Sequence, residues 1–150
     1  MAAPAGIPAK VKASRALHRG ERYAGRLPVR QLPRLAVVSA DGAGELDVDL
    51  WAEKDPQGEW LKGHVRGTLP LTCQRGLHPY DWACDLDLAL RLVHSEAEEA
   101  RLLKEFDPYW VRDDELPLRE MIEEEVLLAL PMLPRCPDPD CAPSVRGAVR

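Results

Sequence analysis

Residues 82–93, WACDLDLALRLV, carry an apolar side chain at every second position, and this period of two constrains the fold more than any other feature. The alternate apolar positions are Trp82, Cys84, Leu86, Leu88, Leu90 and Leu92. Asp85, Asp87 and Arg91 help to line the opposite side of an extended chain. Successive side chains of a strand point to opposite faces of a sheet, so the pattern predicts a strand with one buried and one exposed face.

The same period of two occurs on both sides of the turn sequence DPQG at residues 55–58, which predicts a β-hairpin. Before the turn, Leu46, Val48 and Leu50 alternate with Asp47 and Asp49. After it, apolar Leu61, Val65, Leu69, Leu71 and Cys73 alternate with Trp60, Lys62, His64, Arg66 and Thr68. A loop centred on Pro56 and Gln57 places Asp49 opposite His64 and Asp47 opposite Arg66, where opposite charges pair across the strands.

Helical signals are shorter and lie around these strands. Leu32, Leu35 and Val38 are spaced by three residues and predict a short helix, while Ser95 and Glu98 form a capping box that opens a helix through about Glu105. Residues 106–115 are expected to be a loop or an edge strand. The final helix is expected from near Pro117 to Leu130, with Asp113, Asp114 and Glu115 at its N-terminal end and its apolar last turn buried.

These elements predict an α+β fold, in which an antiparallel sheet, either open or curled into a barrel, is covered by the C-terminal helix and accompanied by short additional helices. A chain of 150 residues is expected to form one domain. We place a single α+β domain at residues 21–141, between a flexible basic arm at 1–20 and a C-terminal tail at 142–150.

Charge is distributed unevenly along the chain. Residues 1–34 hold eight basic residues and one acid, Glu21, whereas the remainder holds 12 basic and 24 acidic residues. The basic residues of the N-terminal part are Lys10, Lys12, Arg15, Arg19, Arg22, Arg26, Arg30 and Arg34. A basic arm on an acidic body is typical of proteins that contact nucleic acid, so these eight are the candidate RNA-binding residues, and a solvated tail is the alternative interpretation.

Signals of catalysis are weak. The sequence has neither a Gly-x-Ser-x-Gly elbow nor a Gly-rich phosphate loop. Glu123 and Glu124 are expected on the solvated side of the final helix, whereas Glu125 is expected on its inward side, paired with an arginine. No apolar stretch approaches the roughly 20 residues that span a membrane, and no secretory signal begins the chain, so we expect a cytoplasmic protein without a membrane or small-molecule partner.

Cysteine spacing raises the question of a metal site. Cys136 and Cys141 are separated by four residues, a workable spacing for a zinc knuckle, and Cys73 with His78 would supply the other half. Gly76 stands where a second cysteine would complete a C-x2-C pair, and strand parity turns Cys84 toward the core. Reduced structural thiols are the first interpretation, zinc bound by these four residues is the second, and a Cys136–Cys141 disulfide is the third.

Three segments resemble the YceD family of bacterial large ribosomal RNA subunit accumulation proteins. They are RYAGRLPV at 22–29, LTCQR at 71–75 and MIEEEVLLALPMLPRCPDPDC at 121–141. The resemblance extends from about Arg22 to Cys141, and it implies participation in producing or stabilising 23S ribosomal RNA, without an enzymatic reaction. Members often carry a C-x2-C pair at the position of Cys73, from which this sequence departs at Gly76.

Two further function classes stay open beside such an assembly factor. One is a metal- or carboxylate-dependent RNA-processing hydrolase, which needs a water-activating metal or a pair of tuned carboxylates in a cleft. The other is a module that binds only proteins. As an assembly factor, the chain is expected to use its basic residues on the phosphates of large-subunit precursor rRNA and its acidic body on basic ribosomal proteins.

Overall fold

The computed structural model describes residues 7–102, 107–138 and 141. A five-stranded sheet forms its centre in the order β2-β3-β4-β5-β6, and a two-stranded sheet pairs β1 with β7. The strands are β1 (Val11–Lys12), β2 (Arg22–Pro28), β3 (Glu45–Asp55), β4 (Gly58–Thr72), β5 (Pro79–Val93), β6 (Asp107–Trp110) and β7 (Glu115–Leu116). The helices are α1 (Ala13–Arg19), α2 (Pro33–Val38), α3 (Glu96–Leu102) and α4 (Leu118–Ala129), with 3-10 turns η1 (Val29–Gln31) and η2 (Ala40–Gly42).

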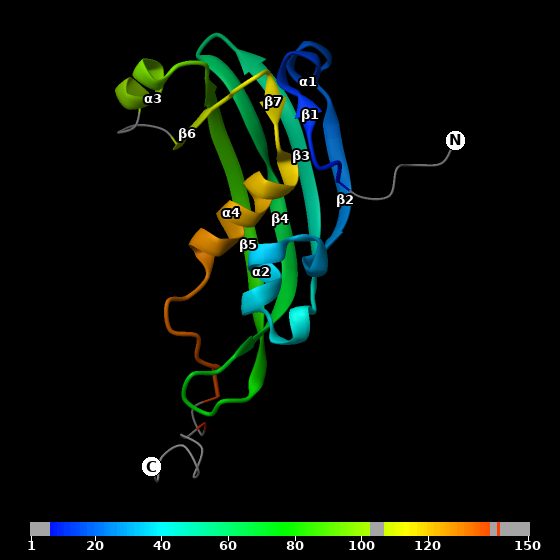
Figure 1. Cartoon of the computed structure of the whole chain (residues 1–150), viewed down its shortest axis with the longest axis vertical. Helices are drawn as coiled ribbons and strands as arrows, with labels where there is room; N and C mark the ends of the chain where they lie inside the picture. The colour runs from blue at the N-terminus through cyan, green and yellow to red at the C-terminus, as the bar shows by residue number, and fades with distance from the viewer. Residues whose placement is uncertain (1–6, 103–106, 139–140, 142–150) are drawn as a thin grey trace, which may run out of the picture.

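The predicted α+β class is confirmed, and the sheet is open rather than closed into a barrel. Strands β2 to β5 pair antiparallel, whereas β6 pairs parallel with β5, with Leu90 opposite Asp107 and Val93 opposite Trp110. The helix α3 between β5 and β6 returns the chain so that both strands run in one direction (Figure 1). The sheet is thus mostly antiparallel, as predicted, and the parallel pair lies at one edge.

The long hairpin has the predicted turn and register. The Asp55 carboxylate accepts hydrogen bonds from the backbone N–H groups of Gln57 (2.9 Å) and Gly58 (3.0 Å), which fixes the turn. Asp49 lies opposite His64 and Asp47 opposite Arg66. The ion pairs expected between these residues are nevertheless wrong, because each side chain bonds to its other neighbouring strand.

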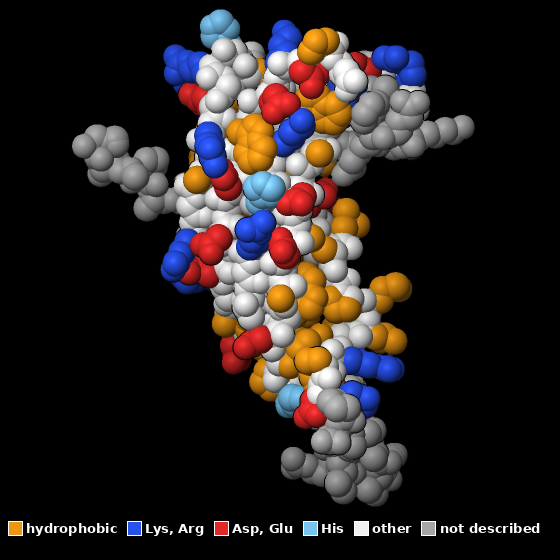
Figure 2. Space-filling view, turned by 180° about the vertical axis from the view of Figure 1, so that it is seen from behind, with side chains coloured by type: hydrophobic (Ala, Val, Ile, Leu, Met, Phe, Trp, Pro, Cys, Tyr) orange, Lys and Arg blue, Asp and Glu red, His pale blue; other side chains and the backbone are white. Residues whose placement is uncertain are grey.

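On the helix-free face of the sheet, charged side chains pair across β2–β3 and β4–β5. Arg22 binds Asp49, Arg26 binds Asp47 (3.3 Å), His64 contacts Asp87, and Arg66 binds Asp85 (3.0 Å). Figure 2 shows this face, with positive and negative side chains interspersed over its upper half. Trp60, which the alternation assigned to the exposed face, is nonetheless buried, and Lys62 and Arg91 lie over its ring.

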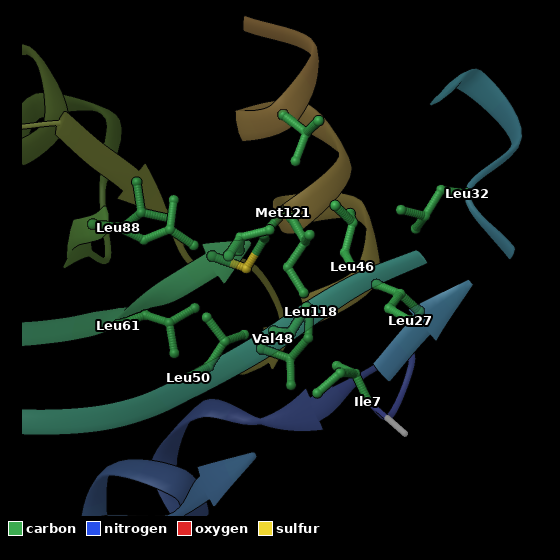
Figure 3. Close-up of a cluster of buried hydrophobic side chains, with 14 of the residues drawn as sticks. Ile7, Leu27, Leu32, Leu46, Val48, Leu50, Leu61, Leu88, Leu118 and Met121 are labelled. Atoms are coloured by element: carbon green, nitrogen blue, oxygen red, sulfur yellow. The ribbon is translucent and has the colours of Figure 1, made fainter. Parts of the chain in front are cut away.

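The opposite face of the sheet carries the hydrophobic core. Leu118, Met121, Ile122 and Val126 of α4 pack on the inward side chains of the strands, as Figure 3 shows in part. Helices α2 and α4 lie in front of this face in Figure 1. The predicted final helix is confirmed, but its last turn is not buried all round: the Leu128 side chain is 71% exposed, since the core contacts only one side of the helix.

The N-terminal segment differs from the flexible arm expected at residues 1–20. From Ile7 the chain is part of the fold: Ile7 is 1% exposed in the core, and α1 buries Ala13 and Ala16. Asp114 accepts hydrogen bonds from the backbone N–H (2.9 Å) and hydroxyl (2.6 Å) of Ser14, so it caps α1 instead of α4. Residues 1–6 and the predicted tail at 142–150 lie outside the described residues.

Helix α2 confirms the short helix expected around Leu35, and a residue of α4 holds it in place. Glu123 is 3% exposed, and its carboxylate accepts hydrogen bonds from the backbone N–H groups of Arg34 (2.7 Å) and Leu35 (3.0 Å). The solvated position expected for Glu123 is therefore wrong, whereas Glu124 is exposed as expected and Glu125 is half-buried. Glu123 replaces the side-chain cap that the first turn of α2 lacks.

Candidate metal centre

Four potential metal ligands meet at the end of the molecule where the β4–β5 loop approaches the C-terminal segment (Figure 1). Cys73 directly follows β4, His78 directly precedes β5, and Cys136 and Cys141 follow α4. One ligand atom from each residue lies within 4.8 Å of the other three. The structure therefore brings together the four residues that cysteine spacing had predicted as a set.

Backbone hydrogen bonds shape the β4–β5 loop around Cys73. The N–H of Leu77 donates to the Cys73 carbonyl (2.8 Å), and the N–H of Cys73 donates to the His78 carbonyl (2.8 Å). Leu77 has a φ of 60°, so the chain reverses tightly there. The N–H of Gln74 donates to the Pro134 carbonyl (2.7 Å), which joins this loop to the C-terminal segment.

The Cys73 sulfur is surrounded by hydrogen-bond donors. The backbone N–H groups of Gly76 (3.3 Å) and Cys136 (3.4 Å) both donate to it. These bonds, the Gly76 bond first, lower the pKa of Cys73 to about 6. These donors favour the thiolate form of Cys73, which is the form that binds metal ions.

Arg75 places a positive charge beside the sulfurs. The Cys141 sulfur raises the pKa of Arg75 above its ordinary value, and Cys136 adds to the effect. Arg75 Nε is buried without a hydrogen-bond partner among the residues that the structure describes. Three thiolates and a divalent cation carry a net charge of about −1, so a guanidinium at this place compensates the charge of a filled site.

The donor set and its spacing fit zinc. Three sulfurs and one imidazole nitrogen form one of the common structural zinc sites, in which Zn–S distances of about 2.3 Å put tetrahedral sulfurs about 3.8 Å apart. The sulfurs of Cys73 and Cys141 are 3.7 Å apart. All four cysteines of the chain are free thiols in the structure, and Cys84 lies buried in the core, where desolvation raises its pKa to about 11.

His78 occupies the space that a side chain at position 76 would need. A Cβ atom on Gly76 would lie 2.6 Å from the His78 imidazole and 2.8 Å from the Cys141 sulfur. A cysteine at position 76 would therefore require the His78 side chain to move. The His78 imidazole thus stands where a C-x2-C pair would place its second side chain.

The eight candidate RNA-binding residues do not form a free basic arm, because most of them are paired with carboxylates. Five lie within 4.0 Å of a carboxylate: Lys10 of Glu115, Arg19 of Glu21, Arg22 of Asp49, Arg26 of Glu45 and Asp47, and Arg34 of Glu123 and Glu124. Lys12, Arg15 and Arg30 have no ion pair with a carboxylate of the described chain. Lys12 and Arg15 lie at the α1 end of β2, and Arg30 lies in η1 at its other end.

Sequence reasoning did not identify two features near these sites. Arg75 was overlooked. The available signal was its position two residues after Cys73, since a basic residue close to a cysteine can stabilise its thiolate. Hollows beside β6 are lined by Tyr109 and Trp110, and the aromatic and acidic residues of 106–115 were the available signal for them. Within the described ranges, no helix is both long and apolar enough to cross a membrane.

Comparison with known proteins agrees with the resemblance. Residues 61–148, more than half of the chain, match the family described as "Large ribosomal RNA subunit accumulation protein YceD". A protein of that name from Haemophilus influenzae (strain ATCC 51907 / DSM 11121 / KW20 / Rd) is 28% identical over 129 residues, which cover 85% of this chain and 74% of the relative. No solved structure matches the chain. The chain belongs to the YceD family.

Proposed function

We propose that this protein is a non-enzymatic factor in the synthesis, processing or stability of 23S rRNA, and so in the biogenesis of the large ribosomal subunit. The observation that carries the proposal is the family match, whose description names large ribosomal RNA subunit accumulation. The matched residues include most of β4, all of β5 and α4, and the four residues of the candidate metal centre. The proposed place of action is the cytoplasm, where bacterial ribosomes assemble.

We further propose that the centre formed by Cys73, His78, Cys136 and Cys141 binds a structural zinc ion. Four protein ligands complete a tetrahedral shell, whereas a catalytic zinc keeps one position open for water or substrate. When bound, the ion would tie the β4–β5 loop to the segment after α4. This ligand set therefore favours a binding protein over the alternative of a zinc-dependent hydrolase.

The proposed partners are large-subunit precursor rRNA and ribosomal proteins. Contact with RNA phosphates is best supported for Lys12 and Arg15, because both are exposed, adjacent in the fold and without a carboxylate partner in the described chain. Arg22 and Arg26 would first have to release Asp49 and Asp47. The second candidate is a module that binds only proteins. The ion pairs of Arg22 and Arg26 favour it, because paired arginines are less available to RNA phosphates.

Affinity purification from cells at low salt, followed by a salt step, tests the proposal. Large-subunit precursor rRNA or large-subunit proteins are expected in the eluate. In the double variant Lys12→Gln/Arg15→Gln, the loss of two phosphate contacts should lower the slope of log affinity against log salt by about 2. The matched control is Lys54→Gln/Arg101→Gln, which removes two exposed cations elsewhere and should leave that slope unchanged.

Recovery of neither precursor rRNA nor ribosomal proteins would contradict the assembly-factor proposal. Recovery of ribosomal proteins alone, with equal salt slopes for both double variants, would support the protein-binding module and remove Lys12 and Arg15 from the RNA contact.

A further inference from the structure

Two adjoining pockets form a groove along α3, β6 and α4, on the side of the molecule away from the metal centre (Figure 1). Their volumes are about 490 Å³ and 380 Å³. They share Pro108, Tyr109 and Pro117 in their linings, so they lie side by side. We call this hollow the α3–α4 groove. None of its lining residues belongs to the candidate metal centre.

Apolar and aromatic side chains line part of the groove. Trp110 lies at one end, Tyr109 at the junction of the two pockets, and Leu90, Met121 and Leu128 at the other end. Leu128 is largely exposed although it sits on the core-packed helix α4. Such a surface binds the aliphatic stems and apolar side chains of a polypeptide more readily than a fully hydrated ion.

The remaining lining residues are mostly acidic. The groove has seven carboxylates, from Glu96, Glu99, Asp113, Glu115, Glu120, Glu124 and Glu125, against two guanidinium groups, from Arg34 and Arg112. Arg34 is bound by Glu123 and Glu124. The Arg112 guanidinium lies 4.0 Å from the centre of the Trp110 ring, so this aromatic surface already holds one cation by stacking.

This charge excludes the nucleic-acid backbone and selects a cationic ligand. Phosphates would approach seven carboxylates, of which Glu115 is paired with Lys10 and Glu124 with Arg34, and the remaining excess of negative charge repels them. Lysine and arginine side chains combine an apolar stem with a cationic end, and they match a groove that both apolar and acidic side chains line. The length of two joined pockets fits several consecutive residues better than a single small cation.

We propose that the α3–α4 groove binds a Lys/Arg-rich, extended or helical segment of a partner protein. This inference rests on the proposed function for the identity of the partner, a basic ribosomal protein of the large subunit. Under this proposal the protein has two binding surfaces of opposite charge. The acidic α3–α4 groove binds protein, and the basic surface around Lys12 and Arg15 binds RNA.

A binding assay with purified protein and a defined probe tests this proposal separately from the ribosomal function. The probe is a synthetic 16-residue peptide of lysine and leucine, labelled for fluorescence anisotropy and compared with the peptide in which glutamate replaces each lysine. We expect binding of the lysine peptide that weakens with added salt, and no binding of the glutamate peptide.

Matched charge reversals locate the site. Glu120→Lys changes an exposed residue of the groove, and Asp81→Lys changes an exposed residue of β5 that does not line it. Both shift the net charge by the same amount. Glu120→Lys is expected to weaken peptide binding by about tenfold, as the loss and reversal of one close charge pair implies, and Asp81→Lys by less than about twofold.

Equal weakening by both variants would overturn the assignment, because the peptide would then bind the overall charge of the protein. An absence of lysine-peptide binding would also overturn it, as would a single-stranded RNA oligonucleotide that displaces the peptide from the groove. Each of these results can occur while precursor rRNA still purifies with the protein, so failure of the groove and failure of the proposed function are distinguishable.

Discussion

Substitution of Cys136 by serine is expected to reduce bound zinc from one ion per chain to less than about a tenth of that. A structural zinc site needs all of its soft ligands, and a serine hydroxyl binds zinc far more weakly than a thiolate. Cys136 also donates its backbone N–H to the Cys73 sulfur, so the two ligands are coupled by position. Metal analysis of the purified protein by mass spectrometry measures the zinc content.

The consequences for folding are expected to be local. The core is formed by the sheet and α4, and none of the four ligand residues is part of that cluster. Hydrogen exchange should therefore become faster at residues 73–78 and 134–138 and remain slow in β3, β4 and β5. The control is Cys84→Ala, which should retain zinc, because Cys84 lies in the core.

Substitutions at positions 76 and 78 test whether His78 is one of the four zinc ligands. His78→Ala alone should weaken zinc binding by about tenfold or more. The double variant Gly76→Cys/His78→Ala should recover part of the lost zinc binding, because it removes the imidazole that a Cβ at position 76 would meet at 2.6 Å, while the Cys141 sulfur, at 2.8 Å from that Cβ, has to shift. Wild-type protein without stoichiometric zinc, or Cys136→Ser protein with the wild-type content, would contradict the metal centre.

Substitution of Glu123 by alanine is expected to lower the free energy of unfolding by about 3 kcal/mol, since it leaves one buried and one partly buried N–H group without an acceptor. These are the N–H groups of Arg34 and Leu35, which the Glu123 carboxylate binds from another helix. Glu123→Gln keeps an acceptor oxygen but loses the charge, so its cost should be smaller, about 1 kcal/mol. Urea denaturation at 25 °C measures both values.

The matched control is its neighbour, Glu124. It pairs with Arg34 at the exposed surface (3.0 Å), and exposed pairs contribute little, so Glu124→Ala should change the free energy of unfolding by no more than about 0.5 kcal/mol. A loss at Glu123 no larger than that at Glu124 would show that the carboxylate does not hold α2 against α4.

The sequence predicted those elements in which the spacing of apolar residues shows both the secondary structure and the buried face. The hairpin of β3 and β4, the strand β5 and the helix α4 follow from periods of two and of about 3.6 residues. An edge strand within residues 106–115 was one of two predicted alternatives, and β6, Asp107–Trp110, is such a strand. Its parallel direction did not follow, because four residues are too few to show how a strand pairs. The folded N-terminus was missed because basic residues surround Ile7, Ala13 and Ala16, the few positions that are buried there.

The sequence predicted which side of α4 packs on the sheet, but not which side packs on α2. Its apolar positions place Glu125 between Ile122 and Ala129, on the sheet-facing side, yet Glu123 is the buried carboxylate. The reason is that α2 covers the flank of α4, and periodicity in one helix does not show where a second helix packs. The candidate metal centre was predicted better. Cys73 with His78 offers two ligands and Cys136 with Cys141 offers two more, and a structural zinc site needs four, so each pair indicated the other.

As the factor in 23S rRNA synthesis, processing or stability that we propose, this protein should be needed for normal amounts of 23S rRNA in the cell. The most direct measurement is the ratio of 23S to 16S rRNA in cells of its own species from which the protein is depleted. We expect the ratio to fall on depletion and to recover when the wild-type chain is supplied again. An unchanged ratio in cells fully depleted of the protein would contradict the account.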